Sequence, residues 1–228
     1  TLKAIPQSIP IMPAHTCYVD LDGTLCTYDV PFSTIYGRAL ERLDVENAGF
    51  DAFSRHFFDV FGEASDPYAT AIAATDVPVD PQSFSDSLAT TEIDHTVALP
   101  GAARLLEHLG DTHQVGVLTN GRSSLQREKL HAIGLEGAVD ALIVSSAVGA
   151  WKPDPRIYEI AEERLPADSY TFVSDDLERD LVPALERGWT GIHVTDGREQ
   201  SPSLDPALGS RVHTATTLED CLEYVSAA

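Results

Sequence analysis

The stretch DLDGTL, at Asp20–Leu25, directly follows the short apolar run CYV at Cys17–Val19. We expect a strand to end here, because Asp and Gly favour the turn that would follow it. After such a turn both carboxylates, Asp20 and Asp22, can reach one cavity. Open α/β sheets bind their ligands at the carboxyl ends of parallel strands. A solvated turn with an Asx cap would use the same residue types, so the rest of the chain decides between the two interpretations.

Strand-like and helix-like segments alternate from Leu99 to near the end of the chain. Short apolar runs predict strands at 115–118, 141–144, 170–173 and 192–194. Helical patterns follow Pro100-Gly101, occupy 124–133, follow Asp154-Pro155, end near Gly188 and resume after Thr217. This alternation predicts the α/β class, with a parallel sheet covered by helices on both faces.

A different pattern separates the first strand from this alternation. Apolar residues at helical spacing, such as Tyr36 and Leu40, recur between residues 28 and 99, and no segment there predicts a strand. Asp66-Pro67 and Asp80-Pro81 each resemble an N-cap followed by Pro at the first helical position. We therefore expect a core domain made of residues 1–27 and 99–228. Residues 28–98 would form an inserted helical domain.

The composition restricts the partners and the compartment. The 228-residue chain has a net charge of −21, and its lysines are limited to Lys3, Lys129 and Lys152. So acidic a surface disfavours nucleic acids and anionic membranes. The sequence has no apolar run long enough to span a bilayer and no pattern of a signal peptide. We expect a cytoplasmic protein, a monomer or a small homo-oligomer, from a host with a salty cytoplasm, where salt screens the self-repulsion.

The three cysteines predict buried thiols and no disulfide framework. Cys17, Cys26 and Cys221 are an odd number, and their spacing is not that of metal ligands. Two of them flank the acidic stretch, where a small buried side chain is the simplest interpretation.

Polar residues recur where the predicted strands end. These residues are Asp20 and Asp22, Thr119 and Asn120, Lys152, and Asp175, Asp176 and Asp180. A right-handed doubly wound sheet brings such ends to one edge. Clustered carboxylates repel each other unless a cation lies among them, and oxygen ligands with an open position suit Mg²⁺ bound together with a phosphate. Within such a site one Asp could attack phosphorus, a second could act as general acid and base, and Lys152 could neutralise phosphoryl oxygens.

On these residues the chain resembles the haloacid dehalogenase superfamily of hydrolases. Four segments match the signature motifs of that family in order: DLDGT at Asp20–Thr24, VLTN ending at Asn120, KPDP beginning at Lys152, and Ser174-Asp175 with Asp180. Ser174 stands where that family usually has Gly. The resemblance covers most of the chain and implies a Rossmann-like, doubly wound core with an inserted helical cap after the first motif.

The resemblance also implies roles for these residues. Asp20 would be the nucleophile and Asp22 the general acid and base, while Thr119 and Lys152 would bind phosphoryl oxygens together with Asn120 and Gly121. Mg²⁺ would be held by Asp20, the backbone carbonyl of Asp22 and Asp175, with Asp180 in support. The partner would be a small phosphorylated substrate.

The implied activity is a Mg²⁺-dependent phosphatase that acts through an aspartyl-phosphate. Thr119–Gly121 together with Gln126 and Lys129 is similar to phosphatases that act on nucleotides, flavin mononucleotide or sugar acid phosphates; sugar phosphates and phosphoglycolate belong to the same range. A phosphomutase, or a catalytically silent phosphate-binding or interaction protein, stays open as an alternative. Dehalogenation is disfavoured because the dehalogenases lack the second Asp of the first motif. A phosphonate-cleaving cap lysine is also disfavoured, since no lysine lies between Lys3 and Lys129.

Overall fold

The computed structural model describes residues 15–195 and 204–225. Its main sheet contains six parallel strands in the order β5-β4-β1-β6-β7-β8. They are β1 (His15–Val19), β4 (Gln114–Thr119), β5 (Ala141–Val144), β6 (Ser169–Ser174), β7 (Thr190–Val194) and β8 (Val212–Ala215). The sheet confirms the predicted α/β class. Its topology is Rossmann-like, because β4 and β5 lie on one side of β1, and β6, β7 and β8, which come later in the chain, lie on the other side.

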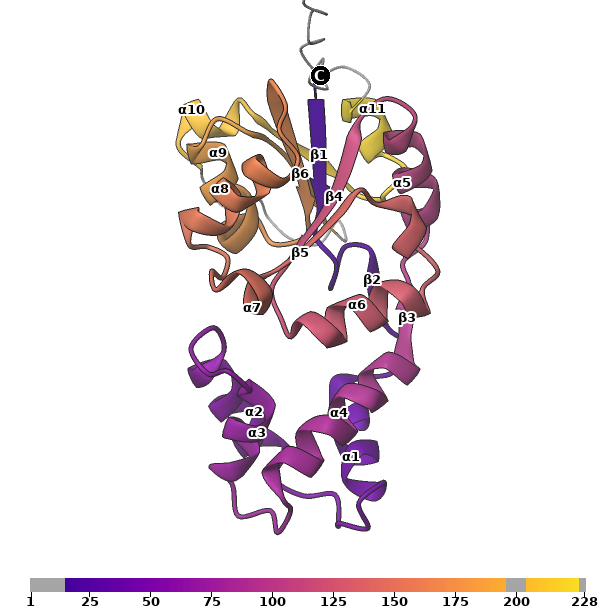
Figure 1. Cartoon of the computed structure of the whole chain (residues 1–228), viewed down its shortest axis with the longest axis vertical. Helices are drawn as coiled ribbons and strands as arrows, with labels where there is room; N and C mark the ends of the chain where they lie inside the picture. The colour runs from indigo at the N-terminus through magenta and orange to yellow at the C-terminus, as the bar shows by residue number, and fades with distance from the viewer. Residues whose placement is uncertain (1–14, 196–203, 226–228) are drawn as a thin grey trace, which may run out of the picture.

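Helices cover both faces of this sheet (Figure 1). One face carries α8 (Pro155–Arg164) and α9 (Val182–Glu186), and the opposite face carries α5 (Ala102–Gly110) and α11 (Cys221–Val225). Three further helices belong to the same half of the molecule: α6 (Ser123–Ala132), α7 (Ser145–Val148) and α10 (Pro206–Gly209). A 3₁₀ turn at Glu136–Ala138 and a π-helical turn at Leu177–Leu181 complete this part.

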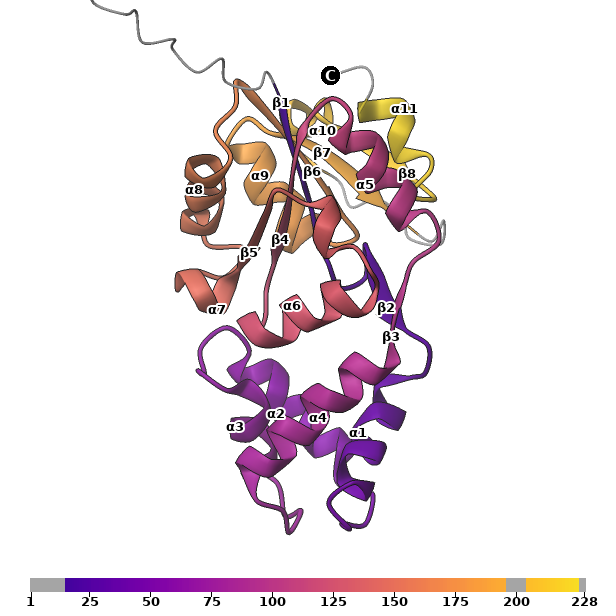
Figure 2. The ribbon, with the colours of Figure 1, turned by 45° about the vertical axis from the view of Figure 1, so that its right-hand side comes forward.

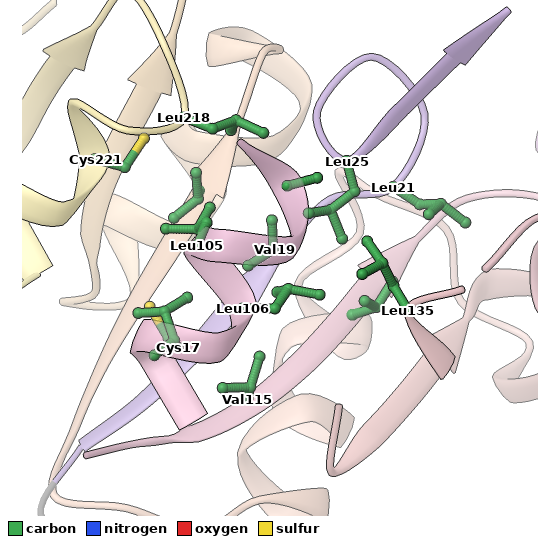
Figure 3. Close-up of a cluster of buried hydrophobic side chains, with 14 of the residues drawn as sticks. Cys17, Val19, Leu21, Leu25, Leu105, Leu106, Val115, Leu135, Leu218 and Cys221 are labelled. Carbon is green, nitrogen blue, oxygen red and sulfur yellow. The ribbon is translucent and has the colours of Figure 1, made fainter. Parts of the chain in front are cut away.

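The central strand β1 shows why helices must pack on both faces of the sheet. All five of its residues are buried, which is expected of a parallel strand packed on both faces. Tyr18 points to one side, where it stacks on Trp189. Cys17 and Val19 point to the other, where they pack among Leu105, Leu106 and Cys221, as Figure 3 shows. Alternate residues of one short strand therefore anchor both cores.

The three cysteines lie where the sequence predicts them. Cys17, Cys26 and Cys221 are buried and free, so the expectation of small buried thiols is confirmed. Among the described residues no helix is both long and apolar enough to cross a membrane.

A second group of helices lies at the carboxyl-end edge of the sheet (Figures 1 and 2). This helical unit contains α1 (Phe32–Glu41), α2 (Phe50–Val60), α3 (Pro67–Ala73) and α4 (Pro81–His95). Asp66 and Asp80 cap α3 and α4 through their side chains, with Pro at the first helical position, as predicted. The unit has its own core, centred on Tyr36, Phe53 and Phe84.

Some local predictions were wrong or incomplete. No strand was expected between residues 28 and 98, yet β2 (Cys26–Tyr28) pairs antiparallel with β3 (Thr96–Ala98). Strands of three residues are too short to show a period, and their pairing is set by where the helical unit leaves and rejoins the core. Strand β8 and helix α10 were not predicted, and the last helix begins at Cys221, after a turn in which Thr217 accepts the Asp220 N–H.

Candidate active site

The order of the strands brings distant residues to one place. Strand β1 lies between β4 and β6, and the chain reverses its direction of travel across the sheet at β1. Asp20 follows β1, Thr119 ends β4, and Asp175 follows Ser174 at the end of β6. Three neighbouring strands therefore deliver their terminal side chains to the switch point, where open α/β sheets bind ligands.

Lys152 lies between two buried carboxylates. Its Nζ donates to Asp20 Oδ1 at 2.7 Å, to Asp180 Oδ2 at 2.7 Å and to the Leu118 carbonyl at 3.1 Å. Ser174 Oγ donates to the same Asp180 oxygen at 2.7 Å. Burial raises the pKa of Asp20 and the charge of Asp180 adds to that effect, while Lys152 opposes it. One ammonium therefore serves two carboxylates in a site with little solvent.

Asp22 belongs to a second charged cluster. Its Oδ1 accepts from Lys129 Nζ at 2.9 Å, and its Oδ2 accepts from Gln126 Nε2 at 2.6 Å. Burial alone would raise the pKa of Asp22, but the Lys129 charge and the Gln126 hydrogen bond outweigh it and lower the pKa. Lys129 also donates to Tyr28 OH at 2.7 Å and pairs with Glu92 Oε2 at 2.8 Å. This cluster joins α6 of the core to α4 of the helical unit.

The surroundings of Asp175 fit a hard cation. Thr24 Oγ1 donates to Asp175 Oδ1 at 3.2 Å, and burial raises the pKa of this carboxyl. Gly23 adopts φ +88°, and a Cβ added there would lie 2.3 Å from Asp175 Oδ2. The missing side chain thus lets the Asp175 carboxylate approach the backbone after Asp22. Asp175 faces a hollow that it shares with Gly23 and Thr24. Carboxylates and backbone carbonyls are the oxygen donors that Mg²⁺ prefers, and a magnesium site that joins Asp175 to Asp20 stays a prediction.

Asp180 has a different setting from Asp175. Its Oδ2 accepts from both Lys152 and Ser174, and Arg179 Nε approaches its Oδ1 at 3.4 Å. The described residues contain no group of three or more His, Cys, Asp or Glu side chains arranged to hold a metal. A metal at this place would therefore need backbone and substrate oxygens, and the supporting role of Asp180 stays a prediction.

Thr119, Asn120 and Gly121 lie at the end of β4, as the sequence indicates. Thr119 Oγ1 accepts from Gln126 Nε2 at 2.8 Å. The Asn120 amide exchanges two hydrogen bonds with the backbone of Lys152, at 3.0 and 2.9 Å, and the Gly121 N–H donates to Ser145 Oγ at 2.9 Å. The side chain of Asn120 therefore holds the Lys152 segment in place. One N–H of its amide is not used in these bonds, and the predicted contact of Asn120 with phosphate stays a prediction.

A cavity of about 500 Å³ opens above these groups. Its polar wall includes Asp20, Asp22, Thr119, Lys152 and Arg179. Its opposite wall is mainly aromatic and belongs largely to the helical unit, with rings from β2, α1, α2 and α3. The polar end of the sheet and the helical unit thus enclose one space.

Sequence reasoning assigned no role to several residues of this site. The sequence indicates Gln126 and Lys129 only as part of a stretch that is similar to certain phosphatases, and it gives no indication of a role for Glu92 or Arg179. One signal was available, since Lys129 is one of only three lysines in the chain. Glu92 carries no local signal, because its contact with Lys129 depends on how the helical unit packs. His193, on β7, hydrogen-bonds the Asp175 carbonyl through Nε2 at 3.0 Å.

The fold and this set of side chains define an α/β protein with a site of buried carboxylates and lysines at the carboxyl-end edge of its sheet. Residues 14–186 match the sequence profile of haloacid dehalogenase-like hydrolases. The match covers more than half of the chain, and the protein belongs to the haloacid dehalogenase-like hydrolase family. The expected family is confirmed.

Individual relatives differ in what they act on. The chain is 29% identical to the pyrimidine 5′-nucleotidase YjjG of Escherichia coli over 56% of this chain and 59% of that protein, which is less than two thirds of its length. It is 27% identical to the ribulose-1,5-bisphosphate 5-phosphatase of Halopiger xanaduensis over 91% of this chain and 97% of that protein. It is 32% identical to the (S)-2-haloacid dehalogenase 4A of Burkholderia cepacia over 42% of this chain and 43% of that protein.

Solved structures agree with the fold. The crystal structure of a HAD phosphatase from Thermococcus onnurineus superposes with a TM-score of 0.71 at 21% identity, over 94% of this chain and 98% of that one. At that identity the likeness concerns the fold alone.

Proposed function

We propose that this protein is a phosphatase that hydrolyses the phosphate monoester of a small metabolite. The observation that supports this most directly is the pair of aspartates at the cavity, Asp20 and Asp22, each held by its own lysine. Relatives that align with the chain include a nucleotidase and a sugar-bisphosphate phosphatase. The proposed substrate belongs to the nucleotides, flavin mononucleotide, the sugar phosphates or phosphoglycolate.

Asp20 is the proposed nucleophile. The contact of Lys152 with Oδ1 orients the carboxylate, so that Oδ2 attacks phosphorus. The new bond joins Asp20 to phosphorus as the bond to the leaving oxygen breaks, which gives an aspartyl-phosphate. Water then attacks phosphorus, the bond to Asp20 breaks, and inorganic phosphate leaves. Lys152 and Thr119 bind the non-bridging oxygens, whose negative charge grows during both steps.

Asp22 is the proposed general acid and base. In its protonated form it donates a proton to the leaving oxygen, and in its ionised form it accepts one from the attacking water. The Lys129 ammonium and the Gln126 amide favour the ionised form. These two residues therefore hold Asp22 in the state that the second step needs.

We propose that Mg²⁺ is the cofactor of this site. Asp20, Asp175 and the backbone carbonyl of Asp22 would hold it, and it would supply positive charge for the phosphoryl oxygens. Asp180 would support this site indirectly, because its carboxylate accepts hydrogen bonds from Lys152 and Ser174.

The helical unit acts, in this proposal, as a cap over the core made of residues 1–27 and 99–228. It provides the wall of the cavity that faces the two aspartates. Such a cap excludes water and selects the leaving group.

The dehalogenase relative favours one competing activity. Halide release from 2-haloacids would use the same nucleophile, but Asp22 has no part in that reaction. A phosphomutase would return the phosphoryl group to a second hydroxyl of the substrate instead of to water.

The test is release of phosphate from a panel of phosphomonoesters in high salt with Mg²⁺. Wild type is compared with Asp20→Asn, with a chelator control and a parallel assay of halide release from a 2-haloacid. We expect phosphate from wild type alone, and only with the metal. Halide release without phosphate release would replace the proposal with dehalogenation, and an isomeric phosphate ester among the products would replace it with a mutase.

A further inference from the structure

Eight aromatic rings line the side of the cavity that faces the charged residues. They come from β2, α1, α2 and α3, and are Tyr28, Phe32, Phe50, Phe53, Phe57, Phe58, Phe61 and Tyr68. Several pack on each other: Phe57 stacks on Tyr68 with ring centroids 5.3 Å apart and lies 5.1 Å from Phe61. Six of the eight rings are phenylalanines, which offer no hydrogen bond to the hydroxyl groups of a sugar. A planar apolar group, in contrast, can stack on them.

Phe58 shows that the wall does more than fill the core of the helical unit. Its side chain is 74% exposed although it lines the cavity, whereas Phe53 on the same helix is fully buried. The other large exposed hydrophobic residue among those described is Val97, which lies outside the cavity. One exposed ring is ordinary by itself, but Phe58 is continuous with the other rings of the cavity, where a ligand would cover it.

Glu92 adds a polar group to the same cavity. Its side chain is 1% exposed, and its Oε2 accepts from Lys129 and from Tyr28 OH. Burial, the Glu92 charge and a side-chain hydrogen bond with Glu92 raise the pKa of nearby Tyr68. Within ordinary hydrogen-bond distance and angle, Glu92 Oε1 has no partner among the described residues. An unpaired buried carboxylate oxygen is costly, so a ligand that donates a hydrogen bond to it would be favoured.

The size of the cavity agrees with a substrate larger than a triose phosphate. At about 500 Å³ it falls within the range of about 300–1,000 Å³ that holds drug-sized ligands. A three-carbon phosphate would leave most of the aromatic wall in contact with water.

We propose that the leaving group of the substrate carries a heteroaromatic ring with an N–H or O–H donor, as the nucleoside part of a nucleoside monophosphate does. The ring lies against the aromatic wall near Phe58, and its donor binds Glu92 Oε1. This inference rests on the proposed phosphatase activity, with the phosphoryl group at Asp20. It selects among the substrate classes by the chemistry of the cavity, and it makes Phe58 and Glu92 specificity-determining residues.

The main test compares substrates that share one reacting bond. Nucleoside 5′-monophosphates and ribose 5-phosphate carry the phosphoryl group on the same carbon, and differ in the base. We expect kcat/KM to be about tenfold to hundredfold higher for the best nucleotide, since stacking of one base on aromatic side chains is worth about that factor. Equal or higher kcat/KM for ribose 5-phosphate would overturn the inference and leave the phosphatase proposal intact.

Two variants locate the effect. Phe58→Ala should lower the nucleotide-to-ribose-phosphate ratio of kcat/KM by fivefold or more, while Val97→Ala, the matched exposed control, should keep the wild-type ratio. Glu92→Gln should lose the discrimination between the best nucleotide and its analogue with the ring N–H methylated. If Glu92→Gln fails to fold, the Phe58 comparison decides alone, and an unchanged ratio in Phe58→Ala contradicts the inference.

A binding measurement separates this inference from the phosphatase proposal. Nucleosides without phosphate, at millimolar concentration, should raise the melting temperature of wild type more than that of Phe58→Ala. Binding without any phosphate release would preserve the aromatic site and refute the phosphatase. Absence of both binding and nucleotide hydrolysis would refute the inference.

Discussion

The molecule contains two buried lysines, and each lies between two carboxylates. Lys152 pairs with Asp20 and Asp180, while Lys129 pairs with Asp22 and Glu92. The side chains in the first cluster are at most 4% exposed, but in the second the Asp22 side chain is 41% exposed. The pKa of Asp20 is raised and that of Asp22 is lowered. Clusters of the same composition thus favour opposite protonation states for two aspartates only two residues apart.

The clusters also differ in where their partners come from. Every partner of Lys152 belongs to the core, from the ends of β1 and β4 and the turn after β6. Lys129 instead joins Asp22 of the core to Glu92 of α4. The first cluster is therefore complete without the helical unit, whereas the second has its Glu92 partner only when the unit is docked. This difference can be tested by substitution.

The largest effect is expected for Asp20→Asn. Removal of the proposed nucleophile should lower kcat by about 10⁴-fold or more, as for other groups that form a covalent intermediate. The melting temperature should not fall, because the variant removes a carboxylate that shares its lysine with Asp180. Phosphate release measures the first expectation and thermal unfolding the second. Turnover near the wild-type rate would remove Asp20 from the nucleophile role.

A smaller loss is expected for Asp22→Asn. General acid–base help is worth roughly 10²–10⁴-fold, and the Asn side chain keeps the hydrogen bond from Lys129. The pH dependence of kcat should lose the step that belongs to Asp22. A variant with the wild-type pH profile would show that another group moves the proton.

Replacing each lysine in turn measures how much each cluster contributes to the free energy of unfolding. Lys152→Met leaves two buried carboxylates without their cation and should lower the free energy of unfolding by about 3–5 kcal/mol. Lys129→Met should cost less, about 1–3 kcal/mol, because Asp22 can regain water and the buried Glu92 keeps the hydrogen bond from Tyr28. Urea unfolding in high salt measures both values. The reverse order would mean that docking of the helical unit contributes more than burial.

The smallest expected effect is a change in how the free energy of unfolding depends on pH. A carboxyl with a raised folded pKa binds more protons in the folded state, so wild type should lose stability relative to Asp20→Asn as pH rises above about 3.9. A carboxyl with a lowered pKa stabilises the fold above about 3.9, and Asp22→Asn should lose that contribution there. Unfolding of metal-free protein between pH 3 and 8 tests this. If the stabilities of Asp20→Asn and Asp22→Asn, each relative to wild type, changed with pH in the same way, the opposite pKa shifts of the two aspartates would be contradicted.

Much of the fold could be predicted because its signals are local. The buried run before Asp20 and the Asp-Pro caps of α3, α4 and α8 are visible in neighbouring residues. Strands β2 and β3 could not be predicted, since each contains three residues and their pairing joins segments far apart in the chain. Strand β8 has two half-buried residues and one exposed one, so its apolar signal is weak.

The candidate site also contains residues whose position could be predicted from the sequence and residues whose contacts could not. Asp20, Thr119, Lys152 and Asp175 follow strands or precede a helix, so their position at the sheet edge follows from topology. The partner of Asp22 could not be deduced from order along the chain. Its contact with Lys129 depends on where α6 crosses the end of the sheet, and the link to Glu92 depends on packing between α4 and α6.

The pairing of β2 with β3 places Tyr28 opposite Thr96. Both ends of the helical unit therefore leave the core at one point, and a short hairpin turn could join them in its absence. A lineage could exchange this unit for another of different size without disturbing the sheet or the Lys152 cluster. The Lys152 cluster would survive such an exchange unchanged, whereas the Lys129 cluster would lose Glu92 and would need a new partner from the incoming unit.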